Sequence, residues 1–412
     1  MLMKATQISD EQGSLKVNVT DERNIPITQA GVTIFDQNGN EIANLLTDMS
    51  GQTDELELEA PDANISLNED STEKPYAKYD IEISAPGYET ARINGSEILS
   101  TTLSFQIIKL RSANTTSVEE INIEEHNLYQ DYPEKIREDE IKQINEPGEI
   151  VLSRVVVPEY VVVHDGSPDS NAKDYYVTYK DYIKNVASSE IYATWPRAAI
   201  EANVLVIMSF TLNRVYTEWY RNRGKNYTIT SSTAYDQKWI YGRNIYKTIS
   251  DIVDSIFNQY LSRPDVRQPI LTQYCDGRRV SCPNWLSQWG SCDLAQRGYS
   301  TIEILRYYYG NSIYINKAEQ ISGIPSSWPG YNLTVGSTGQ KVEQIQQQLA
   351  TISRVYSAIP RISADGIYGE RTRQAVSRFQ EVFSMPVTGI VDFATWYQIS
   401  QIYVGITRIA EN

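Results

Sequence analysis

This 412-residue chain has only three cysteines and two histidines. It contains no H-E-x-x-H zinc helix and no G-x-S-x-G nucleophile elbow. The three cysteines, Cys275, Cys282 and Cys292, fall in a region (181–310) without a histidine, which excludes a Cys–His nucleophile there. Their potential partners are also too few for a four-ligand zinc site, so we expect packed or partly paired thiols. Carboxylate chemistry remains, with no metal and no cofactor.

Glu190 is the carboxylate best placed for acid–base chemistry. It ends a short predicted helix in KNVASSEIYATWP, among apolar and small residues. Partial burial raises a carboxyl pKa, which keeps a proton available near neutral pH for donation to a glycosidic oxygen. The alternative is that Glu190 only caps or pairs at a helix end. The rival acids are Asp236 and, on a long helix where solvation or ion pairing is expected, Glu201 and Glu218.

A single acid suffices for one class of glycan cleavage. A glycosidase usually needs a second carboxylate, as nucleophile or as base for water. A lytic transglycosylase does not, because the substrate's own C6 hydroxyl attacks C1, so that one group first donates and then accepts the proton. Candidate sugar contacts are aromatic or polar residues on loop-like sequence, whose alternative role is loop packing. These candidates are Tyr235, Gln237, Tyr274, Asp276, Arg278, Trp285 and Trp289.

The elements that position these residues fall into several domains. After a tail at 1–13, residues 14–110 alternate apolar and polar side chains in SLKVNVTD, GVTIFD and YDIEIS, with turn signals such as Asn38-Gly39 between them. Short strands at this spacing predict an all-β sandwich. The run from PITQAGVTIFDQNGNEI to TDMSGQ resembles the carboxypeptidase-regulatory-like β-sandwich family. This resemblance covers about a quarter of the chain and implies a fold rather than a chemistry.

The charge of the chain is concentrated in its first part. Residues 1–150 carry 30 acidic and 11 basic residues, whereas the remainder carries 22 and 26. Residues 111–155 are acidic and poor in apolar periodicity, which predicts a flexible linker with a helical turn or two around 134–144. An acidic segment tethered to a mildly basic remainder is interpreted as a pro-segment, whose inhibition salt should partly relieve. The alternatives are a soluble acidic domain, an intramolecular chaperone or a targeting segment.

Residues 156–330 mix strands and helices and predict an α+β catalytic domain. Trp195-Pro196 marks the start of a long helix over 197–220 that is nearly apolar on all sides and should be buried centrally. No stretch approaches eighteen uninterrupted apolar residues, so no membrane span is expected. The start of the chain has no apolar h-region, so a standard signal peptide is not expected either. We expect activation cleavage where the linker meets the apolar VVVPEY strand, near Ser153, Arg154, Val155 and Val156.

The tail, 331–405, predicts a small all-α three-helix bundle. Its pattern is L-x-V-G-S-x-G-x-x-V-x-x-I-Q-x-x-L from Leu333, D-G-I-Y-G-x-x-T-x-x-A-V-x-x-F-Q from Asp365 and T-G-x-V-D-x-x-T-W from Thr388. Glycine turns separate the helical faces. The pattern resembles the peptidoglycan-binding family 1 module, and this resemblance implies attachment to bacterial cell-wall peptidoglycan.

The central region resembles the SpoIID-type lytic transglycosylase family. A tyrosine-led helix (Tyr182), a glutamate (Glu190), Trp195-Pro196 and a long apolar helix follow in the family's order. The resemblance implies that Glu190 is the general acid and base. ITSSTAYDQKWIYG resembles the segment with a glutamine before a glycine, and TQYCDGRR resembles the tyrosine-led glycine loop. The residues after Trp195-Pro196 depart from the family's Glu-Ala-Leu-Lys-Ala-Gln, and no histidine matches the zinc ligands of some members.

The order of domains resembles a subgroup, the SleC-type spore cortex-lytic enzymes of clostridia. KDYIKNVASSEIYATWP, RQPILTQYCDGRRVSCPNW and GIPSSWPGY carry this resemblance over at least 156–405. It implies a zymogen in the cortex or coat layer of the spore, activated in germination when a serine protease removes the N-terminal region. Its partners would be cortex peptidoglycan and that protease, without nucleic acid. The alternative is a non-catalytic cell-wall-binding structural protein with a degenerate SpoIID-like domain.

Overall fold

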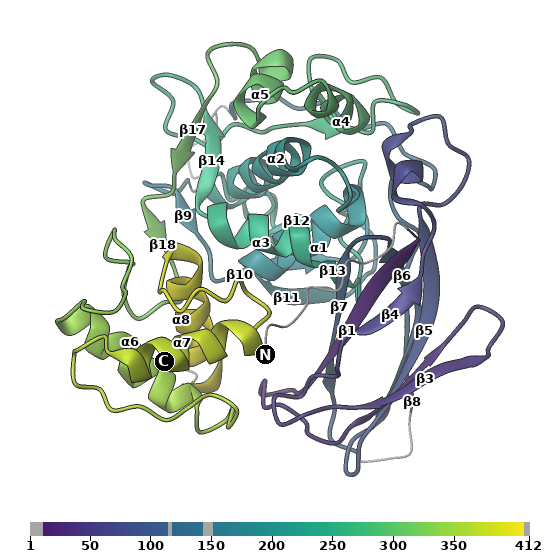
Figure 1. Ribbon diagram of the computed structural model, residues 1–412. Helices are drawn as coiled ribbons and strands as arrows, with labels where there is room; N and C mark the ends of the chain where they lie inside the picture. Colours follow the sequence, from purple (N-terminus) through teal and green to yellow (C-terminus); the bar gives the residue numbers. More distant parts are fainter. Residues whose placement is uncertain (1–10, 114–117, 143–150, 408–412) are drawn as a thin grey trace.

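The computed structural model describes residues 11–113, 118–142 and 151–407 (Figure 1). The predicted tail at 1–13 lies outside the described residues as far as residue 10, and the first strand, β1, already begins at Gln12. A β-rich part, a mixed helical part and a bundle of helices follow each other along the chain, as the sequence predicts.

The N-terminal part is a sandwich of two sheets. Its strands alternate buried and partly exposed positions, as in β2 and β5, because apolar side chains on one face fill the space between the sheets. Val17, Val32 and Ile81 are completely buried there. The four-stranded sheet consists of β13 (Ile245–Tyr246), β7 (Leu103–Leu110), β1 (Gln12–Asp21) and β4 (Leu56–Glu59). The five-stranded sheet consists of β3 (Glu41–Leu46), β2 (Gly31–Phe35), β5 (Tyr76–Ser84), β6 (Thr90–Leu99) and β8 (Val118–Asn122).

Two strands of this sandwich come from outside the predicted 14–110. Strand β8 lies within the predicted linker and pairs in parallel with β6. Strand β13 belongs to the central region and pairs antiparallel with β7. Gly242, shortly before β13, adopts φ 78°, and a Cβ there would lie 2.3 Å from the side chain of Ile121 in β8. The sandwich and the central region therefore share a sheet, and the backbone at Gly242 of the central region packs closely against β8 of the sandwich.

The prediction of a flexible linker over 111–155 is wrong for residues 118–142. This stretch supplies β8 and then runs extended over the central region, without the helical turns predicted around 134–144 in its described part. Three of its acidic side chains pair with basic residues of the central region: Glu124 with Lys238, Glu138 with Arg214 and Glu140 with Arg263. Tertiary ion pairs and backbone hydrogen bonds order a stretch whose apolar residues follow no helical or strand period.

The central region is built around the helix α2 (Arg197–Tyr216), which contacts α1, α3, α4, α5 and β14 (Figure 1). It is long and apolar enough to cross a membrane, but 83% of the relevant window is buried, as in a core helix. It ends at Tyr216 rather than at 220, because Glu218 adopts φ 45°. The remaining elements are β9 (Val156–Val157), β10 (Tyr160–His164), β11 (Asp174–Thr178), α1 (Tyr179–Glu190), η2 (Arg221–Arg223), β12 (Ile229–Thr230), α3 (Lys247–Ile256), β14 (Gln259–Ser262), β15 (Tyr274–Cys275), β16 (Leu286–Ser287), α4 (Gln288–Gln296), α5 (Thr301–Tyr309), β17 (Tyr314–Lys317) and β18 (Gln320–Ile321).

The C-terminal bundle consists of α6 (Gln340–Ile352), α7 (Glu370–Val382) and α8 (Phe393–Thr407). Two buried glutamines fix its loops in the same way. The Gln346 side chain accepts from the backbone of Asp365 and Gly366, and Gln380 accepts from Thr388 and Gly389. The bundle also packs on α3, where Phe257 contacts the rings of Phe393 and Tyr397.

Candidate active site around Glu190

Glu190 is the last residue of α1, and its carboxyl group is completely buried. The helix begins after Thr178, whose side chain caps the Asp181 amide. One carboxyl oxygen, Oε1, accepts from the backbone N–H of Lys238 at 2.7 Å. The other, Oε2, accepts from Nε2 of Gln288 at 3.4 Å. The group is thus held between the loop around 238 and the first turn of α4.

Burial raises the pKa of Glu190, as expected from its neighbours in the sequence. The ammonium group of Lys135, the Lys238 amide and the Tyr274 hydroxyl oppose this effect and lower the pKa. Burial dominates because a charged carboxylate loses its hydration in an apolar site. A carboxyl of this kind keeps its proton to a higher pH than an exposed one, which a general acid requires.

Tyr274→Phe is expected to move the basic limb of the pH–activity profile of the processed protein to higher pH. The Tyr274 hydroxyl stabilises the charged form of Glu190, so its removal raises the pKa of that carboxyl. The acid then stays protonated further into the alkaline range. The measurement is kcat/KM against pH for both proteins on solubilised peptidoglycan. An unchanged or lowered alkaline limb would contradict the interaction.

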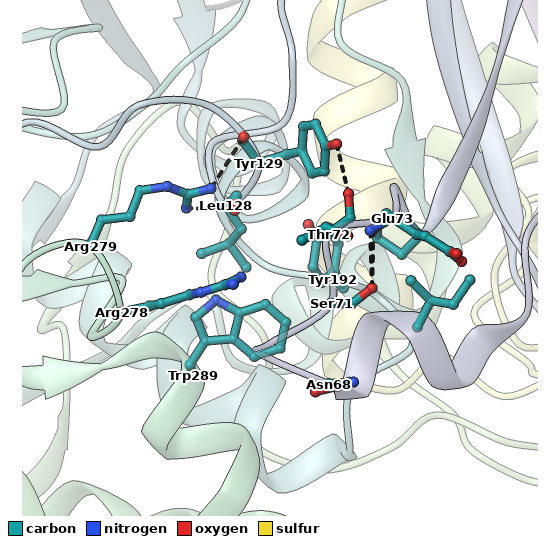
Figure 2. Close-up of a pocket in the computed structure, with 12 residues that line it drawn as sticks. Asn68, Ser71, Thr72, Glu73, Leu128, Tyr129, Tyr192, Arg278, Arg279 and Trp289 are labelled. Carbon is teal, nitrogen blue, oxygen red and sulfur yellow. Dashed lines mark hydrogen bonds between the residues drawn. The ribbon is translucent and has the colours of Figure 1, made fainter.

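A cavity of about 450 Å³ lies close to this site (Figure 2). Tyr192 and Trp289 line it. In the sequence, Tyr192 lies two positions after Glu190, and Trp289 directly follows Gln288. Arg278 and Arg279 lie on one side of it, and residues 71–73 of the N-terminal sandwich lie on the other. The cavity therefore combines aromatic surface with cationic donors.

The structure brings three of the predicted sugar contacts near Glu190 or the cavity. Tyr274 faces the carboxyl group, whereas Trp289 and the exposed Arg278 line the cavity. Trp285 is half-buried, and its ring lies 5.9 Å from the guanidinium of Arg137. Tyr235 is also half-buried, and its carbonyl accepts from Arg214.

Gln237 and Asp276 are both buried, and the protein itself uses their hydrogen-bonding groups. Gln237 is completely buried; its carbonyl accepts from Tyr182 and Thr211, and its amide donates to a carbonyl of α2. The equally buried Asp276 accepts three backbone N–H groups of its own loop, from 278, 279 and 280. The sequence shows that these residues are polar and lie on loops. It does not show that neighbouring backbone and side-chain groups occupy their hydrogen-bonding atoms.

The rival acids are all engaged in ion pairs. Asp236 is buried against the guanidinium of Arg214. The other two lie at the two ends of the long helix region and pair with nearby arginines, Glu201 with Arg197 and Glu218 with Arg221. None of the three contacts Glu190 through a hydrogen bond that the described residues show.

Several residues at the site escaped sequence reasoning. Gln288 and the Lys238 amide hold the carboxyl, while Tyr132 and Lys135 lie close enough for Glu190 to perturb their titration. A backbone amide carries no signal in the side-chain pattern. Tyr132 and Lys135 lie in the stretch interpreted as a linker, where an isolated tyrosine or lysine is expected to be solvated.

Cys275 and Cys282 form a disulfide, whereas Cys292 is free and buried. This agrees with the expectation of partly paired thiols. Among the described ranges, no group of three or more potential ligands is arranged to hold a metal ion. In the predicted cleavage region, Ser153 and Arg154 are exposed, whereas Val155 is buried and Val156 pairs in β9 with β18.

Comparison with known proteins identifies one segment. Residues 338–399 match the family described as "putative peptidoglycan binding domain". No curated protein matches the chain. Among solved structures, the SleB N-terminal domain is 25% identical over 19% of this chain and 99% of its own, with a TM-score of 0.17. The Bacillus anthracis TIE protein is 20% identical over 25% and 18% of the two chains, with a TM-score of 0.19.

The minor pilin GBS52 of Streptococcus agalactiae is 14% identical over 26% of this chain and 48% of its own, with a TM-score of 0.19. The chain thus spans less than half the length of TIE and of GBS52. TM-scores this low carry no argument about fold or function. The match over 338–399 stands apart from them, and it falls on the bundle of α6, α7 and α8.

Proposed function

We propose that this protein is the precursor of a peptidoglycan lytic transglycosylase. The observation that carries the proposal is a buried carboxyl group with a raised pKa, Glu190, beside a cavity, in a chain that also holds a peptidoglycan-binding domain. The cavity beside it offers ring faces and guanidinium donors, which suit a polymer of acetylated sugars bearing carboxylates.

The reaction needs only one proton-transferring group. Glu190 donates its proton to the glycosidic oxygen as the bond to C1 of the muramoyl residue breaks. The C6 hydroxyl of the same residue attacks C1 to form the 1,6-anhydro ring, and its proton passes to the carboxylate. The acid is thereby regenerated, and no water is consumed. Gln288 and the Lys238 amide hold the carboxyl in place through both transfers.

The biological setting forms part of the same proposal. We place the protein in the cortex or coat layer of a spore, with activation during germination by a serine protease that cuts near Ser153–Val156. The exposed Ser153 and Arg154 support a cut on that side of the region, since Val155 is buried. The complete burial of Glu190 in the full chain fits a latent precursor. It equally fits the alternative, a wall-binding structural protein without activity.

The processed protein should release 1,6-anhydromuropeptides from purified peptidoglycan, detected by mass spectrometry. Reducing-end muramic acid without the anhydro ring would indicate a hydrolase instead. If peptidoglycan containing muramic lactam and ordinary peptidoglycan both remain intact after complete processing, the non-catalytic alternative is correct.

The C-terminal bundle should carry binding to the wall by itself. Residues 331–412 fused to an inert carrier are expected to cosediment with insoluble peptidoglycan, because the bundle buries Val342, Phe379 and Trp396 and has its own glutamine-fixed loops. The carrier alone is the control. Equal sedimentation of carrier and fusion would show that this bundle does not bind the wall.

A further inference from the structure

We propose that residues 124–142, which we call the plug, occupy the glycan-binding groove over Glu190 and keep the full chain closed. The identity of the groove's ligand rests on the proposed function. In the sequence, the plug lies between the sandwich and the central region. In the structure, its inward side chains lie at the site around Glu190.

Two plug residues, Lys135 and Tyr132, are buried near the carboxyl group. Lys135 is buried, and its ammonium group donates to the backbone carbonyls of Thr233 and Asp236 and lies 4.6 Å from the centre of the Tyr274 ring. It is also the counter-charge that lowers the pKa of Glu190 most. Tyr132 is buried beside the same carboxyl, whose charge acts on its hydroxyl.

The plug backbone is bonded to the loops on both sides of the site. The Ile136 amide donates to the carbonyl of Ala234 at 2.8 Å. On the other side, the Gln273 side chain accepts from the Glu138 amide at 3.0 Å and donates to the Ile136 carbonyl at 2.7 Å. Further along, the Leu271 amide donates to the carbonyl of Glu140 at 2.8 Å. The plug therefore runs as an extended chain between the 230s loop and the 270s loop.

The inward residues of the plug recur every third position. Tyr132, Lys135 and Glu138 face the central region, whereas Glu134 and Arg137 are exposed. This period is typical of an extended polyproline-type chain, which suits a groove that binds a linear polymer. At the far end, acidic side chains meet basic ones: Glu138 pairs with Arg214 and Glu140 with Arg263.

The groove holds polar groups that the plug leaves without partners. The hydroxyl of Tyr132, the indole N–H of Trp289 and the carbonyl oxygen of Gln288 are buried without a hydrogen bond. Buried polar groups are normally paired, and leaving one unpaired costs about 1–3 kcal/mol. Except for Tyr132, these groups belong to the central region, where they would meet the hydroxyls and acetamides of a bound sugar.

Cutting the chain near Ser153–Val156 does not by itself open this groove. The cut removes the covalent tether, but the hydrogen bonds and ion pairs of the plug remain. Loss of the tether makes its departure a bimolecular equilibrium instead of an intramolecular one. Processing therefore acts by allowing the plug to leave together with the sandwich.

The test uses full-length, uncut protein and the N-acetylglucosamine hexamer as a probe, with binding measured by calorimetry. Lys135→Glu places a second carboxylate against Glu190 and removes two buried hydrogen bonds, so the plug should leave. Arg137→Glu makes the same charge change at an exposed position of the plug and is the matched control. Tyr132→Ala, which opens space without adding charge, is the second variant should Lys135→Glu fail to fold.

We expect Lys135→Glu and Tyr132→Ala to bind the hexamer at least about tenfold more tightly than the unmodified chain and Arg137→Glu, since breaking buried contacts shifts a closed–open equilibrium by at least that factor. The plug proposal is wrong if the unmodified chain binds the hexamer as tightly as the variants do, or if neither folded variant binds it more tightly. If the variants gain binding but release no anhydromuropeptides from peptidoglycan, the plug stands and the proposed reaction falls.

Discussion

Glu190→Gln is expected to lower the rate of glycan cleavage by the processed protein about 10²–10⁴-fold, the range for loss of a general acid and base. Glutamine keeps the shape of the side chain and can still accept from the Lys238 amide, but it can neither give nor take the proton. Folding and sedimentation with the wall should be unchanged, because the bundle that binds it lies far along the chain at 338–399. The measurement is the initial rate of anhydromuropeptide release under saturating peptidoglycan.

Glu201→Gln is the matched control for this substitution. It removes the same charge from the same kind of side chain, at a partly exposed position on α2 where the partner is Arg197 at 3.8 Å. Its rate should stay within about twofold of the unmodified protein, since exposed ion pairs contribute little. A folded Glu190→Gln protein with a normal rate would remove Glu190 from the mechanism, and equal losses in both variants would point to a general effect of charge.

The sequence predicts the parts of this structure that local patterns specify. Alternation along Val17 and Val32 gives the sandwich, and the apolar run after Pro196 gives the buried helix α2. The spacing of glycines and apolar residues gives the bundle in the tail. In each case the residues that form an element also carry its periodicity, so that burial and local propensity agree.

Long-range contacts explain what sequence reasoning missed. Strand β13 has two residues, and it exists because its backbone meets β7 of the sandwich. The buried state of Lys135 depends on two carbonyls near 233–236, about a hundred residues away. Gln237 looked like a ligand contact because the sequence does not show that Tyr182 and Thr211 use its oxygen. Only tertiary structure decides between a solvated polar residue and a buried, paired one.

The charge split does not describe every contact between the two halves. An acidic sandwich attracted to a basic remainder would be held through solvent and weakened by salt. The two halves also share a sheet and a completely buried ion pair, between Glu97 of β6 and Arg243 beside β13. Asn244 adds two hydrogen bonds to the backbone of Glu97. Buried pairs are screened much less than exposed ones, so we expect little relief by salt.

Arg243→Ala is therefore expected to destabilise the full chain by about 3–5 kcal/mol, the cost of leaving one partner of a buried ion pair alone. Glu97 would remain without a counter-charge at the junction of the sandwich and the central region. Arg92→Ala is the matched control, because Arg92 pairs with Glu82 on the exposed face of the same sandwich, and its loss should cost less than about 1 kcal/mol. Urea unfolding, monitored by tryptophan fluorescence, measures the free energy of unfolding of both variants at low salt and at 1 M sodium chloride. At the higher concentration the Debye length is about 3 Å, so exposed ion pairs are screened. If Arg243→Ala unfolds with the same midpoint as Arg92→Ala, or its deficit disappears in salt, the sandwich is held to the central region by its surface charge and the buried pair contributes nothing to the closed state.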